Sequence, residues 1–175
     1  MRSLHAMLAA VGLILAVPPG HAQAPRAYTA THGVSCVDRS RAQFQAWRCP
    51  GPNGYVAEYL DEGNLAGIAI WNPARSRTAQ VSIQWRGVGK VFGNLLEWQY
   101  QDGQPSAAVL RIWRVAGGAD GSERELEELI ILKLQPLGAC RIASVGARQV
   151  DANRIAQEIA SRVLSMPCLG AVEDS

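Results

Sequence analysis

The segment NLLEWQYQDGQPSAAVLRIWRV, residues 94–115, decides the fold class of this chain. It contains two runs rich in Leu, Val, Ile, Trp and Tyr, which favour β-strands, on either side of the sequence QDGQPS. Glycine can adopt a positive φ and proline fixes its own φ, so QDGQPS is typical of a turn. Because no helix fits between the two runs, we expect two antiparallel, neighbouring strands.

The same alternation of apolar runs and turn residues continues on both sides of this segment. The further candidate strands are residues 42–49, 55–60, 64–72, 79–85, 126–136 and 139–146. We therefore predict an α+β fold, in which a mostly antiparallel, curved β-sheet carries one C-terminal helix. The sheet is expected to be a meander of about seven to eight strands.

Residues 122–134 allow two interpretations. Ser122 and Glu125 have the spacing of a helical capping box, and Leu126, Leu129, Ile130 and Lys133 would lie roughly on one helical face. As a strand, the same residues form a buried apolar run after a hairpin tip. The strand is favoured because Pro136 and a turn lead directly into the next strand-like run. The acids Glu123, Glu125, Glu127 and Glu128 would then form a solvated hairpin edge.

The C-terminal helix is expected in DANRIAQEIASRVLSMPC, residues 151–168. Asp151 is a favourable N-cap residue, and Pro167 would end the helix. Its apolar face is expected to consist of Ile155, Ile159, Val163 and Met166.

Tryptophans recur about once per candidate strand, at Trp71, Trp85, Trp98 and Trp113. Such spacing fits either an aromatic platform for a sugar or another flat ligand, or aromatic packing within a sheet and its core. Packing is favoured, because cross-strand aromatic pairs commonly stabilise sheets.

The N-terminal residues have the layout of a secretory signal peptide. Arg2 precedes an apolar run of twelve residues (6–17), and the small residues Ala22 and Ala24 offer two cleavage points. Twelve apolar residues are too few to span a bilayer core of about 30 Å. We expect a signal peptide at 1–24, an extended lead-in at 25–35, a single disulfide-stabilised β-rich domain at 36–170 and a C-terminal tail at 171–175. The predicted location is the periplasm or the extracellular space.

Four cysteines occur in this exported chain, Cys36, Cys49, Cys140 and Cys168. In an oxidising compartment they are expected to form two disulfides. Three connectivities are open, and the local pairs Cys36–Cys49 and Cys140–Cys168 are favoured by their proximity along the chain. A metal site is disfavoured, because the chain has no CxxC pair.

The charge balance gives no reason to expect nucleic acid or an anionic membrane as a partner. Removing residues 1–24 removes one arginine and no acid, which lowers the formal net charge from +2 to +1. No further stretch is long and apolar enough for a transmembrane helix, so no membrane insertion is expected after cleavage.

Catalytic motifs are scarce. His32 is the only histidine left after cleavage, and it lies in a segment expected to be mobile. Catalytic pairs of Ser or Cys with His are therefore disfavoured. Glu97 is the one acid in the middle of an apolar strand and the best candidate for a carboxylate-based hydrolase, although alternation would place it toward solvent. We expect no catalytic residue, no cofactor and no metal.

Two segments carry a resemblance to known proteins. The chain contains WRCPGPNGY, residues 47–55, near the start of its β-rich body, which closes with GACRIASVGARQVDANRIAQEIASRVLSMPC, residues 138–168. In this order of features it resembles a family of small secreted alphaproteobacterial proteins to which no activity is assigned. More distantly, it looks like periplasmic lysozyme inhibitors, whose inhibitory-loop motif is absent here.

These observations favour an exported, non-enzymatic domain that binds or inhibits a protein of the cell envelope. The alternatives are a structural accessory subunit of an envelope complex and the hydrolase built on Glu97. The sequence leaves the oligomeric state open. Because loops on a rigid sheet commonly carry recognition, the ligand-binding residues are expected in two turns, at Pro50, Asn53, Tyr55, Asp61 and Glu62.

Overall fold

The computed structural model describes residues 25–74, 81–85, 89–117, 121–135 and 138–169. The predicted signal peptide, with its cleavage points, and the predicted C-terminal tail lie outside these residues. Among the residues described, no helix has the length and apolar character needed to cross a membrane.

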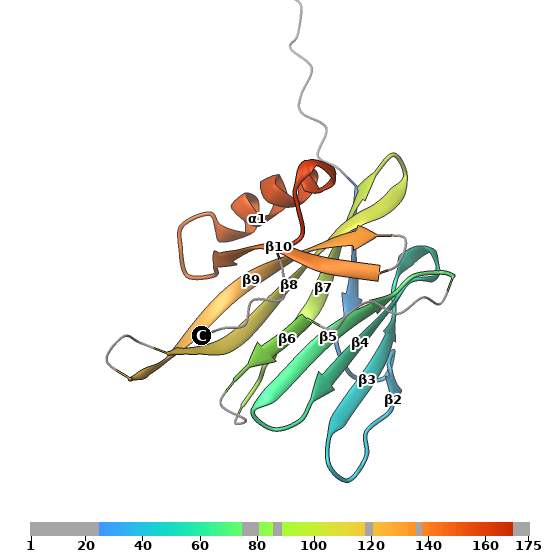
Figure 1. Cartoon of the computed structure of the whole chain (residues 1–175). Coiled ribbons are helices and arrows are strands. Elements are labelled where there is room, and N and C mark those ends of the chain that lie inside the picture. The colour runs from blue at the N-terminus through green and yellow to red at the C-terminus, as the bar shows by residue number, and fades with distance from the viewer. Residues whose placement is uncertain (1–24, 75–80, 86–88, 118–120, 136–137, 170–175) are drawn as a thin grey trace, which may run out of the picture.

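Two antiparallel sheets of five strands each make up the described part of the chain (Figure 1). We call the first the long sheet; in spatial order its strands are β1 (Arg26–Ala30), β7 (Phe92–Gln101), β8 (Gln104–Gly117), β9 (Glu123–Gln135) and β10 (Gly138–Gly146). We call the second the short sheet; its strands are β2 (Val37–Asp38), β3 (Gln45–Pro50), β4 (Val56–Asp61), β5 (Leu65–Trp71) and β6 (Val81–Gln84). Three helical segments complete the structure: η1 (Pro52–Gly54), α1 (Ala152–Ser161) and η2 (Val163–Ser165).

The β7–β8 hairpin is the one predicted from residues 94–115. Its loop consists of Asp102 and Gly103, both with positive φ (51° and 75°), and Gln101 pairs with Gln104 directly beside it. Two residues at positive φ match the right-handed twist of the flanking strands, which makes this one of the tightest hairpin loops available.

The prediction of a mostly antiparallel β fold with one C-terminal helix is confirmed, but the strands form two sheets instead of one. The reason lies in the long sheet, because consecutive residues 129–132 of β9 are all buried. A strand that is apolar on both faces needs a cover on each. Helix α1 covers one face and the short sheet covers the other (Figure 1).

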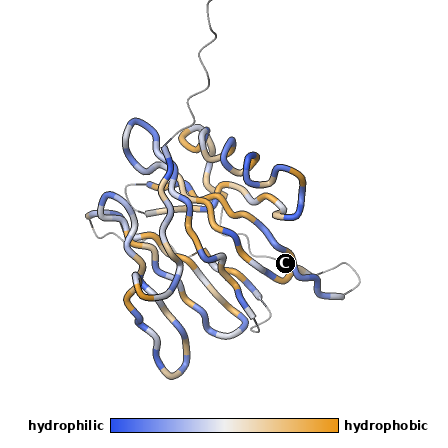
Figure 2. The backbone as a smooth tube through the Cα atoms, turned by 180° about the vertical axis from the view of Figure 1, so that it is seen from behind, coloured by the Kyte–Doolittle hydropathy of each residue, from blue (hydrophilic) through white to orange (hydrophobic). Residues whose placement is uncertain are grey.

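The inter-sheet core is formed by large apolar side chains from both sheets. The short sheet contributes Tyr59, Ile68, Ile70 and Ile83, and the long sheet contributes Leu96, Trp98, Leu110, Ile112, Ile130 and Leu132. Figure 2 shows how hydropathy varies along the chain: hydrophobic stretches follow the strands, whereas hydrophilic residues gather at hairpin tips. Burial of this apolar surface is the main favourable term in folding.

The helix packs through smaller residues than predicted. Ala152, Ala156 and Ala160 are buried against the other face of the long sheet, whereas Ile155 and Ile159 are only partly buried. Alanine at every fourth position places the helix axis close to the sheet. The predicted boundaries also differ, because α1 ends at Ser161, before Pro167.

Asp151 occupies the N-cap position without capping through its side chain. Its backbone is left-handed (φ 60°, ψ 21°), and its Oδ2 accepts a hydrogen bond of 3.0 Å from Arg154 Nη2. Aspartate tolerates this conformation better than most residues.

Both predicted disulfides, Cys36–Cys49 and Cys140–Cys168, are present. The first attaches the segment before β2 to β3. The second attaches the segment that follows η2 to β10, where Leu169 N also donates to Arg141 O at 2.8 Å. Each disulfide closes a loop in the unfolded chain and stabilises the fold by about 3 kcal/mol in the chain-entropy description.

Two further segments are settled by the structure. Residues 123–135 form strand β9, as favoured over the helix. The lead-in at 25–35 contains strand β1, which pairs with β7 from Arg26–Gln99 to Ala30–Leu95. Its ladder of hydrogen bonds makes it an ordered edge of the long sheet, contrary to the expectation of a mobile segment around His32.

Candidate functional site

The first predicted binding loop is packed on the core. Gly51 lies so close to Trp98 that an added Cβ would approach the ring at 2.7 Å, and Tyr55 stacks in a tilted arrangement with its ring centroid 5.8 Å from that of Trp98. Burial raises the pKa of the Tyr55 phenol. Pro50 is exposed at the end of β3, and Asn53 donates from Nδ2 to Gln104 Oε1 at 3.2 Å. The loop therefore closes one end of the inter-sheet core.

The second predicted loop lies at the other end of β4. Asp61 is the last residue of that strand, and Glu62 follows it in a turn in which Glu62 N donates to Leu65 O at 2.7 Å. The six residues of β4 extend over roughly 17 Å. The five predicted residues therefore do not form one site, and only Asp61 lies at the pocket described next.

A pocket of about 360 Å³ opens between the two sheets at the Asp61 end of β4. The pocket lies where two segments of the chain cross from one sheet to the other, one between β1 and β2 and one between β6 and β7. We call it the rim pocket; it is lined by Thr31, His32, Gln45, Trp47, Asp61, Trp85, Gly89, Lys90, Val91, Phe92 and Asn94. Small-molecule sites are typically concavities of at least about 300 Å³ with apolar walls and a few polar groups.

The apolar wall of the rim pocket is continuous with the core. Trp85, Val91 and Phe92 are buried, and Trp47 is half-buried against the same core cluster. Tyr59, the cross-strand partner of Trp47, contacts Phe92 edge to face at 5.2 Å between ring centroids. These walls are therefore held in place by the inter-sheet core.

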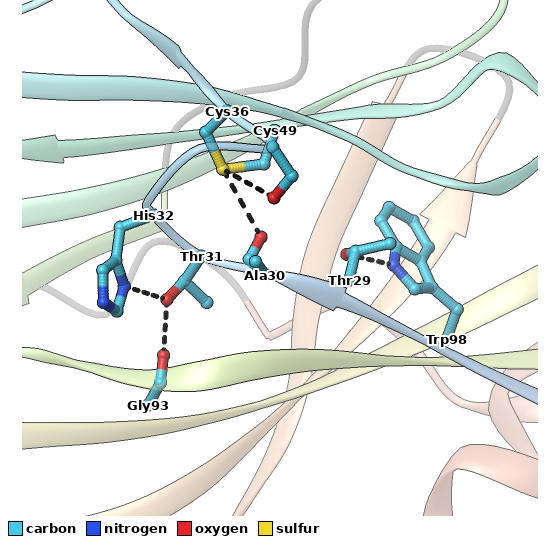
Figure 3. Close-up of a disulfide and its surroundings, with 9 residues drawn as sticks. Thr29, Ala30, Thr31, His32, Cys36, Cys49, Gly93 and Trp98 are labelled. Atoms are coloured by element: carbon cyan, nitrogen blue, oxygen red, sulfur yellow. Dashed lines mark hydrogen bonds between the residues drawn. A yellow bond between two sulfur atoms is a disulfide. The ribbon is translucent and has the colours of Figure 1, made fainter.

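Thr31 fixes the position of His32 at the pocket (Figure 3). The buried Thr31 hydroxyl donates to the carbonyl oxygen of Gly93 at 2.7 Å and lies 2.9 Å from His32 Nδ1. A hydroxyl has one proton, and here it is given to Gly93, so Oγ1 must accept from a protonated Nδ1. In the neutral imidazole, Nε2 is then the acceptor.

The segment that carries Thr31 and His32 is held at several points along its length. Trp98 Nε1 donates to Thr29 Oγ1 at 2.8 Å, and the Cys36–Cys49 disulfide anchors the far end of the crossing (Figure 3). This wall of the pocket is thus preorganised, which lowers the entropic cost of binding.

Charged groups of both signs line the pocket. Lys90 Nζ donates to Asn94 Oδ1 at 2.6 Å and lies 5.6 Å from the centroid of the Trp113 ring, while Asp61 Oδ1 accepts from Gly63 N at 3.0 Å. Each group keeps hydrogen-bonding capacity beyond these contacts, since an ammonium has three donors and a carboxylate about four acceptor sites.

Two buried side-chain polar atoms have no hydrogen-bond partner within the described ranges, Tyr59 Oη and Trp85 Nε1. Trp85 lines the rim pocket, and Tyr59 lies beneath its lining residues Trp47 and Phe92. Burial raises the pKa of the Tyr59 phenol far above its ordinary value, so its hydroxyl stays protonated. Buried polar groups without partners are rare in folded proteins, and one of the two, Trp85 Nε1, belongs to a residue that lines the pocket.

A second concave area lies on the outer face of the short sheet, where two pockets of about 400 and 540 Å³ share Arg48. Glu58 accepts from Arg48 Nε at 3.2 Å and from Trp71 Nε1 at 2.8 Å, and the Arg48 guanidinium lies 4.8 Å from the centroid of the Trp71 ring. These central polar groups satisfy one another, which makes the area a weaker candidate than the rim pocket.

Glu97, the candidate hydrolytic acid, does not face open solvent. Its side chain is 14% exposed under α1, and its carboxylate accepts from Gln99 Nε2 at 3.0 Å and from Gln157 Nε2 at 3.3 Å. Arg26 lies 3.7 Å away as an ion-pair partner. The carboxylate is enclosed by amides and a cation, so no second acid for hydrolysis is among these contacts.

The four regularly spaced tryptophans do not form a common platform. Trp98 is fully buried in the inter-sheet core, Trp85 lines the rim pocket, Trp71 lies on the outer face of the short sheet, and Trp113 lies under Lys90. Sequence reasoning missed His32, Lys90 and Trp47 as pocket residues. No spacing motif connects them, because they converge only through the two crossings between the sheets.

Comparisons of this chain with protein-family models, with curated proteins and with solved structures find no match. No group of three or more His, Cys, Asp or Glu side chains in the described part of the chain is placed to hold a metal ion.

Proposed function

We propose that this chain is an exported, non-enzymatic binding domain of the cell envelope, and that the rim pocket is its ligand contact. The observation that carries the proposal is a preorganised pocket lined by Trp85, whose buried Nε1 has no hydrogen-bond partner among the residues that the structure describes. Export rests on the signal-peptide pattern of residues 1–24 and agrees with the two disulfides.

Binding is favoured over catalysis by the chemistry of the pocket lining. The described lining contains no serine and no cysteine, and the hydroxyl of Thr31 is already donated to Gly93. A side-chain nucleophile would need a base within hydrogen-bond reach of its own proton. What the lining offers instead is aromatic surface together with donors and acceptors, which is the composition of a recognition site.

The proposal is tested by ligand-observed saturation-transfer NMR with four probes of different charge and shape: methyl β-D-glucopyranoside, benzoate, benzylamine and phosphocholine. The mature chain should transfer saturation to at least one probe, and Lys90→Ala or His32→Ala should weaken that probe's binding. Both residues are exposed, so these variants are expected to fold.

Arg162→Ala is the matched control, because Arg162 is an exposed cation at the end of α1, in the layer beyond the long sheet. Binding of the probe should be unchanged in this variant. Absence of transfer to all four probes, or equal loss in Arg162→Ala and Lys90→Ala, would contradict the rim pocket as the site.

A further inference from the structure

We infer that the rim pocket recognises a neutral, hydroxyl-rich ring, the chemistry of a hexopyranose sugar. The inference rests on the proposed binding function and names the class of ligand for that site. Three properties of the pocket carry it: its aromatic wall, its balance of donors and acceptors, and its size.

The aromatic wall suits a pyranose ring. Trp47 comes from β3 and Trp85 follows β6, so two indole rings from separate strands line the same pocket. A pyranose presents C–H groups on its faces and hydroxyls at its edge. Indole rings bury apolar surface of this kind and carry an N–H donor at the ring edge.

Side chains that line the pocket carry both donors and acceptors. Lys90 has further N–H donors, and Trp85 Nε1 is a buried donor with no acceptor among the residues that the structure describes. On the accepting side are the Asp61 carboxylate and, in the neutral form, His32 Nε2.

This balance discriminates between classes of ligand. A carboxylate or phosphate ligand could only accept hydrogen bonds, would leave Asp61 unused and would be repelled by its charge. A cation could only donate and would be repelled by Lys90. A hydroxyl group both donates and accepts, so a ring with several hydroxyls can satisfy both sets of groups.

The volume of the pocket suits a small ligand. The rim pocket holds about 360 Å³, which lies near the lower end of the range of about 300–1,000 Å³ found for small-molecule sites. It also opens at the edge of the two sheets, where a ring at the end of a longer chain can enter.

The inference is tested by isothermal titration calorimetry with three matched monosaccharides: methyl β-D-glucopyranoside, glucuronate and protonated glucosamine. We expect the neutral sugar to bind at least tenfold more tightly than either charged one, a difference of about 1.4 kcal/mol. Trp85→Phe keeps the aromatic ring and removes the donor, so it should weaken binding of the neutral sugar about tenfold.

Two further variants separate recognition from folding. Asp61→Asn removes the negative charge and should reduce the discrimination against glucuronate, an effect that a folding defect would not produce. Trp71→Phe also removes an indole donor, but on the outer face of the short sheet, and should leave sugar binding unchanged.

Failure of this inference is distinguishable from failure of the proposed function. If benzoate, benzylamine or phosphocholine binds at the pocket and the neutral sugar does not, the binding function stands and the sugar inference is wrong. If glucuronate binds as tightly as the neutral sugar, the inference is also wrong. If no probe binds, both are overturned.

Discussion

The hydroxyl of Thr31 donates a hydrogen bond of 2.7 Å to the carbonyl oxygen of Gly93, although the two residues lie 62 positions apart in the chain. This contact attaches the crossing from β1 to β2 to the start of strand β7. It also fixes the tautomer of His32 through the second contact of the same hydroxyl.

Thr31→Val should therefore lower stability and ligand binding together. Valine keeps the shape of threonine but leaves the buried carbonyl of Gly93 without its donor, at a cost of about 1–3 kcal/mol. Thr31→Ser keeps the hydroxyl, so it should lose less stability and less ligand binding than Thr31→Val. Urea denaturation of both variants measures the difference, and equal losses would show that the hydrogen bond is unimportant.

Gly51→Ala should destabilise the fold by about 1–3 kcal/mol, because the new Cβ would meet the Trp98 ring at 2.7 Å in a close-packed core. Gly146→Ala is the control: no heavy atom lies within 4 Å of a Cβ built there. Thermal unfolding of the two variants makes the comparison. A neutral Gly51→Ala would mean that the loop at residues 50–55 moves freely away from Trp98.

Glu97→Gln should leave any measured activity of the protein unchanged, because Glu97 is enclosed by Gln99, Gln157 and Arg26. The amide loses the ion pair with Arg26, so the stability of the variant is expected to fall while any activity does not. Glycoside hydrolysis by the wild-type chain that Glu97→Gln abolishes would restore the hydrolase alternative.

Glu127 should make the fold sensitive to acid. The hydrogen bond from Arg111, assisted by Arg148, holds the pKa of this carboxyl below its ordinary value of 4.5. A lowered pKa in the folded state contributes stability above the unfolded value, and this contribution is lost as pH falls through the folded pKa.

The urea midpoint of the wild type should therefore fall as pH decreases below 4.5, and it should fall less steeply in Glu127→Gln. The exposed Glu123 at the start of the same strand provides the matched control, since Glu123→Gln should keep the wild-type slope. Parallel pH profiles for wild type and Glu127→Gln would contradict the assignment.

Local chemistry was enough to predict strands β3 to β10, because each run of β-branched and aromatic residues ends at turn residues, but it did not predict the short strands β1 and β2. The Asp102–Gly103 loop and both disulfides follow from such short-range signals. The division of the strands into two sheets does not follow from such signals, because the crossing between β6 and β7 has the same turn-like composition as an ordinary hairpin loop.

Contacts made over long distances in the chain explain the remaining differences. The order of β1 comes from its pairing with the distant strand β7, and Glu127 is covered by Arg111 of the neighbouring strand β8, so neither feature follows from the adjacent sequence. The buried face of α1 does not follow from its hydrophobic pattern, because isoleucines dominate that pattern while Ala152, Ala156 and Ala160 are the residues buried against the sheet. His32 and Trp85 meet at the rim pocket for the same tertiary reason.

The rim pocket as the binding site is tested most directly by the indole N–H resonance of Trp85 in the mature, isotope-labelled chain during titration with methyl β-D-glucopyranoside, benzoate, benzylamine and phosphocholine in turn. The account predicts that at least one probe shifts the Trp85 resonance in a saturable manner while that of Trp71, on the outer face of the short sheet, stays in place. A Trp85 resonance that does not move with any probe, or that moves only together with Trp71, would contradict it.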